Sequence, residues 1–164
     1  MRKTFILCSL LFALSACGWA PMHTDAAGGN AAHRDIFISP ISGTNGIDLR
    51  NGLRAEFGVG DDAAAAKYAL SVDLQKPETI YKALQITGDA TWQEVRMTAR
   101  YELKENATGR VIVTATDTAS ESYTFVRDLV AANASYNNAV QNTIRILSEK
   151  ISTRIAANLA KESE

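Results

Sequence analysis

The chain has 164 residues, of which 46% are hydrophobic and 21% are charged, and its formal net charge is -1 at pH 7. This length predicts one domain of ordinary size, and the composition excludes a disordered, collagenous or coiled-coil chain. Because positive charge is not in excess, nucleic acid is not an expected partner.

The first sixteen residues have the pattern of a secretory signal peptide. Arg2 and Lys3 form a basic start, and residues 5–14 are almost purely apolar. This stretch is too short to span a bilayer as a helix, which needs about 20 residues. A basic start, a short apolar stretch and small residues before a cleavage site are typical of exported proteins. Residues 1–16 are therefore predicted to be removed.

The predicted cleavage site resembles a bacterial lipobox, Leu14-Ser15-Ala16-Cys17. Small side chains fit a peptidase pocket beside the scissile bond, and the thiol of Cys17 would carry a diacylglyceryl group. An ordinary signal peptide with a chance cysteine is the alternative. Lipidation predicts a stable membrane anchor, since each buried CH2 contributes about 0.8 kcal/mol. Gly18 follows the cysteine, which by resemblance to bacterial lipoprotein sorting favours the outer membrane.

Residues 17–33 are predicted to form the lipid anchor and a flexible tether, because they show no hydrophobic periodicity. A single domain is expected over residues 34–160, followed by a short tail at 161–164. The domain would then stand off the membrane on its tether.

The domain is predicted to open with a strand and a helix. Residues 36–39 form an apolar run closed by a proline, which is typical of a first or edge strand. Residues 44–46 are interpreted as a turn, and a helix is predicted over 47–57, ended by Gly58. Its apolar side chains recur every four residues on one face, at Leu49, Leu53 and Phe57.

Four further strands follow in the predicted order. Residues 68–74 alternate apolar and polar side chains, and residues 80–87 form a less regular strand. The clearest alternation runs over 92–105. Residues 106–109 end in glycine and predict a turn, so 92–105 and 110–119 are expected to form a long hairpin.

From Asp128 onward the hydrophobic period becomes helical. The apolar stripe steps by three or four residues, through Val140, Ile144, Leu147, Ile151, Ile155 and Leu159. Strands bracketed by helices predict an α+β two-layer sandwich, with a mostly antiparallel four-stranded sheet and two helices on one face.

No sequence pattern points to an enzyme, a cofactor or a metal site. The motifs HExxH, GxSxG, GxGxxG and CxxC and the P-loop are absent. Cys8 lies in the predicted signal peptide and Cys17 is predicted to be lipidated, so no thiol is left as a nucleophile or ligand. His23 and His33 lie in or beside the tether and make only a weak metal signal. The chain is interpreted as a non-enzymatic protein.

The order of these features resembles the lipopolysaccharide-assembly lipoprotein family LptE, in its short alphaproteobacterial form. The similarity covers about residues 17–159 and rests on the lipobox before Gly18-Trp19, the strand Tyr68-Ala69-Leu70, the run Ala99–Leu103 leading to Thr108-Gly109-Arg110-Val111, then Ser122-Tyr123 and the closing helix. This resemblance implies an outer-membrane lipoprotein that plugs the lumen of the LptD-type β-barrel. It also implies help in assembling the barrel and in inserting lipopolysaccharide into the outer leaflet.

One strand face carries the candidate ligand-binding residues, Arg96, Arg100 and Lys104. Strand alternation puts them on one side together with Thr98 and Glu102. Local cations suit phosphate groups, so we hypothesise that this face meets anionic lipopolysaccharide or the barrel wall. A solvated strand face is the alternative.

The expected partners are therefore an LptD-type barrel, lipopolysaccharide and the membrane, which the N-terminal lipid would engage. The expected location is the periplasm-facing side of the outer membrane. An unrelated outer-membrane structural or binding lipoprotein with a similar sandwich remains the alternative, because a fold does not fix a function.

Overall fold

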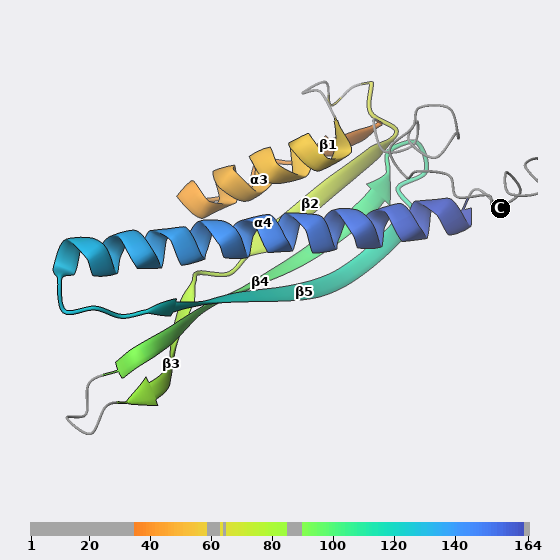
Figure 1. Ribbon diagram of the computed structural model, residues 1–164. Helices are drawn as coiled ribbons and strands as arrows, with labels where there is room; N and C mark the ends of the chain where they lie inside the picture. The colour runs from red at the N-terminus through yellow and green to blue at the C-terminus, as the bar shows by residue number, and fades with distance from the viewer. Residues whose placement is uncertain (1–34, 59–62, 64, 85–89, 163–164) are drawn as a thin grey trace, which may run out of the picture. The chain divides into compact units, whose positions relative to one another are not determined.

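The computed structural model describes residues 35–58, 63, 65–84 and 90–162. In chain order the elements are β1 (Ile36–Ile38), α3 (Thr44–Phe57), β2 (Tyr68–Leu74), β3 (Glu78–Leu84), β4 (Ala90–Glu105), β5 (Val111–Thr124) and α4 (Leu129–Glu162). The strands form one sheet, and both helices lie on the same side of it (Figure 1). The predicted α+β two-layer sandwich is confirmed.

The sheet is built around β4, its longest strand. β5 pairs antiparallel with β4 along one edge, while β2 and β3 pair antiparallel with different halves of the other edge. β1 extends the sheet beyond β2 in the parallel direction, and α3 is the crossover that a parallel pair requires. The sheet has five strands rather than the four expected, because the short strand β1 joins it.

Helix α3 begins at Thr44, three residues before the predicted start, so the interpretation of 44–46 as a turn is wrong. A Cβ atom on Gly46 would lie 2.8 Å from the carbonyl oxygen of Ile41. The glycine therefore serves close packing inside the first helical turn rather than chain reversal. The predicted end is confirmed: Gly58 is left-handed at φ 64°, and its N–H donates to the Arg54 carbonyl at 2.9 Å.

β2 has its predicted bounds, and several other boundaries differ from their predicted positions. β3 begins at Glu78, and the predicted residues 85–87 lie outside the described part of the chain. β5 continues to Thr124, five residues beyond the prediction, because serine and threonine keep alternating with inward side chains. α4 has 34 residues, so it is about 51 Å long. Its first turn is capped by Asp128, whose Oδ1 accepts from the Ala131 N–H at 2.9 Å.

The core lies between the sheet and the helices. Odd-numbered residues of β4 from Val95 to Leu103 are at most 3% exposed. The predicted stripes of both helices meet them, and the buried members are Leu49, Leu53, Phe57, Val140, Ile144, Leu147, Ile151, Ile155 and Leu159. Burial of these side chains is the main stabilising term of the domain.

Candidate interaction surface

The second face of the sheet carries polar side chains, and no helix in the described part of the chain covers it (Figure 1). We call it the open face. On β5 its side chains from residue 114 onward are all hydroxyls, at Thr114, Thr116, Thr118, Ser120, Ser122 and Thr124. Thr98 on β4 faces Thr118, and their Oγ1 atoms are 3.1 Å apart. The open face is therefore suited to contact with solvent or with a polar partner.

Arg96, Arg100 and Lys104 all lie on this open face, and two of them are neutralised by neighbours on their own strand. Arg96 lies 3.0 Å from a carboxylate oxygen of Glu94, and Lys104 lies 2.7 Å from one of Glu102. Arg100 is exposed and makes no hydrogen bond or ion pair among the residues that the structure describes. Arg100 is thus the cation of the three that is available to a ligand.

Glu94 links two strands on the open face. Its carboxylate lies 3.0 Å from Lys82 on β3 and 3.0 Å from Arg96 on β4, and its side chain is only 12% exposed. The hydrogen bond from Lys82 is the main cause that holds the pKa of Glu94 below its ordinary value; burial opposes it, and the hydrogen bond from Arg96 adds to the lowering. This ion-pair network stiffens the face and removes positive charge from it.

The charges on the open face balance. Its described acids are Asp73, Glu78, Glu94 and Glu102, and its described bases are Lys82, Arg96, Arg100 and Lys104. A dedicated site for a polyanion concentrates cations without interleaved acids. The arrangement better suits a polar surface of mixed charge, in which Arg100 lies opposite Asp73 in the register but forms no ion pair among the described residues.

An ion pair between buried Asp117 and half-exposed Arg154 joins α4 to the inner side of the sheet, and sequence reasoning missed it. Asp117 is 7% exposed and accepts from Arg154 at 2.6 and 3.1 Å and from the Tyr101 hydroxyl at 2.6 Å. Burial would raise the pKa of Asp117, but the Arg154 and Tyr101 hydrogen bonds outweigh it and lower the pKa. A charged residue at an inward position of β5 was the available signal.

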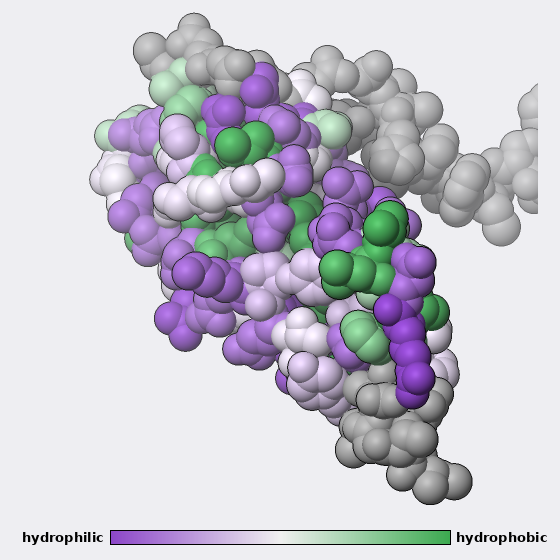
Figure 2. Space-filling view, turned by 90° about the vertical axis from the view of Figure 1, so that its left-hand side faces the viewer, coloured by the Kyte–Doolittle hydropathy of each residue, from purple (hydrophilic) through white to green (hydrophobic). Residues whose placement is uncertain are grey.

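Hydrophobic side chains are exposed where β5 passes into α4. Phe125 is 40%, Leu129 83% and Val130 81% exposed. Figure 2 views the end of the domain where α4 begins and shows hydrophobic side chains beside strongly hydrophilic ones. Trp92, opposite Thr124 in the register, adds a further exposed ring at 56%. Such a patch marks a contact surface when it is contiguous.

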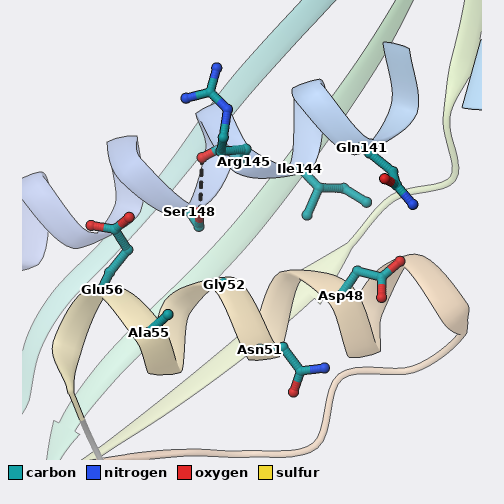
Figure 3. Close-up of a pocket in the computed structure, with 9 residues that line it drawn as sticks. All are labelled: Asp48, Asn51, Gly52, Ala55, Glu56, Gln141, Ile144, Arg145 and Ser148. Atoms are coloured by element: carbon teal, nitrogen blue, oxygen red, sulfur yellow. Dashed lines mark hydrogen bonds between the residues drawn. The ribbon is translucent and has the colours of Figure 1, made fainter. Parts of the chain in front are cut away.

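A shallow groove of about 420 Å³ runs between the outer sides of α3 and α4 (Figure 3). The helices approach closely at Gly52, where an added Cβ would lie 3.1 Å from Ser148 Oγ. Ser148 itself donates to the Arg145 carbonyl at 2.8 Å. Carboxylates at Asp48 and Glu56 stand along the α3 side. The groove follows from the close helix crossing and contains no arrangement of catalytic groups.

Some predicted features lie outside the described residues, namely the signal peptide 1–16, Cys17 and the tether 17–33. Within the described ranges, no three His, Cys, Asp or Glu side chains gather as metal ligands. Neither described helix is long and apolar enough to cross a membrane.

The fold is that of known bacterial lipoproteins. A lipoprotein from Caulobacter crescentus matches at a TM-score of 0.67 and 19% identity, over 82% of this chain and 97% of that one. Rare lipoprotein B from Shewanella oneidensis matches at 0.63 and 16%, over 79% and 98%. A minor lipoprotein from Acinetobacter baumannii matches at 0.57 and 20%, over 77% and 94%.

No protein-family model matches the chain, and no curated protein sequence matches it. The structural matches show that the chain has the fold of lipoproteins of the rare lipoprotein B type. This fold agrees with the resemblance to LptE seen in the sequence. None of the names of these three structures states an enzymatic activity.

Proposed function

We propose that this protein is an outer-membrane lipoprotein that plugs a lipopolysaccharide-export β-barrel of the LptD type, assists the assembly of that barrel, and aids insertion of lipopolysaccharide into the outer leaflet. One combination carries the proposal: a lipobox ending at Cys17 stands in the same chain as a rare lipoprotein B-type fold. Either feature alone is compatible with many lipoproteins.

The proposed anchor is consistent with the geometry of a plug. Removal of residues 1–16 would leave Cys17 as the lipidated N-terminus, with residues 17–33 as a tether before the domain at 34–160. A tether of this length reaches at most about 60 Å when fully extended. That is enough for the domain to leave the membrane surface and enter a barrel lumen.

We propose that the open face is the surface that contacts the barrel wall. Large barrel lumens are lined by polar side chains, and a face of balanced charge and hydroxyl groups matches such a wall without repelling it. We propose that Arg96, Arg100 and Lys104 lie in this contact or at its lipopolysaccharide side. Arg100 has the leading role because its charge is unpaired among the described residues.

The proposal is tested by purifying tagged full-length protein from detergent-solubilised outer membranes and identifying what accompanies it by mass spectrometry. A stoichiometric LptD-type barrel is the expected result. The lipoprotein alone, from a membrane in which the barrel is detected separately, would favour the unrelated binding lipoprotein. A Cys17→Ser variant is the matched control for the anchor, and it should no longer fractionate with the outer membrane.

A further inference from the structure

The outer edge of β5 is not paired with any strand of the described domain, and the register shows which backbone groups it presents. The Gln75 N–H donates to the Thr98 carbonyl at 2.9 Å, so the backbone groups of Thr98 point away from β5. Thr98 lies opposite Thr118. In an antiparallel pair such residues do not bond each other, so the backbone groups of Thr118 point outward to the free edge.

An independent contact gives the same direction. Lys150 Nζ on α4 donates to the Thr118 carbonyl at 2.9 Å, from outside the sheet. Backbone direction alternates along a strand, so the same edge presents the N–H and C=O groups of Thr114, Thr116, Ser120 and Ser122. Their side chains are exposed on the open face. The result is a regular row of outward donors and acceptors that no described strand pairs, with the Thr118 carbonyl taken by Lys150.

This edge is long and has few of the usual protections. Natural proteins blunt edge strands by keeping them short or by adding proline, bulges, charged residues or a covering element. β5 has 14 residues without a proline, and its one register shift lies at its beginning, opposite Leu103 and Lys104. At the centre of the strand the protections are Lys150, which binds the Thr118 carbonyl, and the inward-pointing charge of Asp117.

We propose that the outer edge of β5 binds an extended segment of a protein partner, which adds a strand to the sheet and places an acidic side chain beside Lys150. Backbone hydrogen bonds would supply the affinity, as in other strand additions. The partner's N–H would take over the Thr118 carbonyl, and its carboxylate would take the ammonium group of Lys150. This inference rests on the proposed function in one respect: the expected partner is the barrel protein.

Charge favours an acidic partner segment at this edge over a second copy of the chain. Antiparallel pairing of two β5 edges along their full length puts the two-fold axis near Thr118, the middle of the row. The two Lys150 side chains would then face each other across that axis. Like charges directly opposite oppose pairing, whereas an acidic segment complements them.

Proline substitution tests the edge without disturbing the sheet. Thr116→Pro and Ser120→Pro each remove one outward N–H, which proline tolerates on an edge strand. Thr116→Ala and Ser120→Ala are the matched controls, because they remove the hydroxyl and keep the N–H. In the membrane purification, we expect the proline variants to recover about tenfold less barrel and the alanine variants to recover the wild-type amount.

The proposed charge contact has its own pair of variants. Lys150→Glu should lower barrel recovery by about tenfold through repulsion of the acidic segment, and Lys150→Arg should preserve it. Circular dichroism of each purified variant establishes that the domain is folded. A photo-crosslinking residue at position 120 should join one extended, acid-containing segment of the barrel, and the same residue at position 145, exposed on the outer side of α4, should not join that segment.

The outcomes separate this inference from the proposed function. If the wild-type protein recovers the barrel and folded proline variants recover it equally, the edge proposal is wrong and the plug proposal stands. Crosslinks at position 120 between two copies of the chain would overturn the choice of partner. If the wild-type protein recovers no barrel, the plug proposal fails, and the absence of any crosslinked acidic segment would then overturn the edge proposal as well.

Discussion

The two faces of β4 differ in burial, in polarity and in the interactions that stabilise them. Leu103 on the inner face is fully buried beneath the helices, and its neighbour Lys104 on the open face is half exposed and paired with Glu102. The inner face is held by apolar burial, which scales with area. The open face is held by exposed ion pairs and hydroxyl contacts, which contribute little to stability. The comparison teaches that stability resides on one face and that the other is free to serve binding.

The largest expected effect on stability comes from shortening a buried side chain on the inner face. Leu103→Ala should lower the free energy of unfolding by about 2–5 kcal/mol, because it removes buried methyl groups and leaves a cavity. Lys104→Ala, one residue away on the open face, should change it by no more than about 0.5 kcal/mol. Urea unfolding followed by circular dichroism measures both. Equal losses in the two variants would contradict the division of roles.

The second effect concerns the polar exception on the inner face. Asp117→Ala should lower the free energy of unfolding by about 1–3 kcal/mol, because the buried Tyr101 hydroxyl loses its acceptor. Asp73→Ala, an exposed aspartate of the same sheet, is the matched control and should cost less than about 0.5 kcal/mol. If the two aspartates proved equivalent in urea unfolding, the ion pair of Asp117 with Arg154 would be dispensable.

The same ion pair predicts a pH dependence. The pKa of Asp117 is lower in the folded protein than its ordinary value, so the folded state prefers the charged carboxylate. Its contribution is complete above the unfolded pKa of about 3.9 and is lost as pH falls through the lower folded pKa. The stability difference between wild type and Asp117→Asn should therefore shrink on acidification in that window. A difference that stays constant would exclude the carboxylate as its cause.

The smallest expected effect falls on the open face and concerns binding rather than folding. Arg100→Glu should leave unfolding nearly unchanged and weaken lipopolysaccharide binding by roughly three- to tenfold, since one unpaired cation becomes an anion. Arg145→Glu, on the outer side of α4, is the control with the same charge change. Binding by full-length protein in detergent measures both. Unchanged lipopolysaccharide binding by Arg100→Glu would contradict a lipopolysaccharide contact at Arg100 and leave the barrel wall as the proposed partner of the open face.

The elements themselves were predictable because their signals are local. A period of two predicted β2, β4 and β5, and a period of three to four predicted α3 and α4. The same alternation placed Arg96, Arg100 and Lys104 on one face. The start of α3 was not predictable from composition, because Gly46 is a turn residue in isolation. Only the approach of Ile41 shows that a helix needs a glycine there.

The candidate site was predictable in position but not in chemistry. Alternation cannot show that Glu94 neutralises Arg96 while also holding Lys82 from β3, because that contact depends on strand register. It cannot show that Arg100 is left without such a partner among the described residues. Nor can it show that Asp117 and Arg154 meet, since they lie 37 residues apart and on different elements.

The sequence by itself determined the two-layer α+β class and the side of each strand that faces the core, and it carries the lipobox from which the Cys17 anchor is proposed. These depend on spacing along the chain. The tertiary structure decided that β5 is an edge strand, that Lys150 reaches the carbonyl of Thr118, and that the open face carries balanced charge. Those properties depend on which strands pair and in which register, and pairing is a choice among distant segments that the burial of the whole core settles.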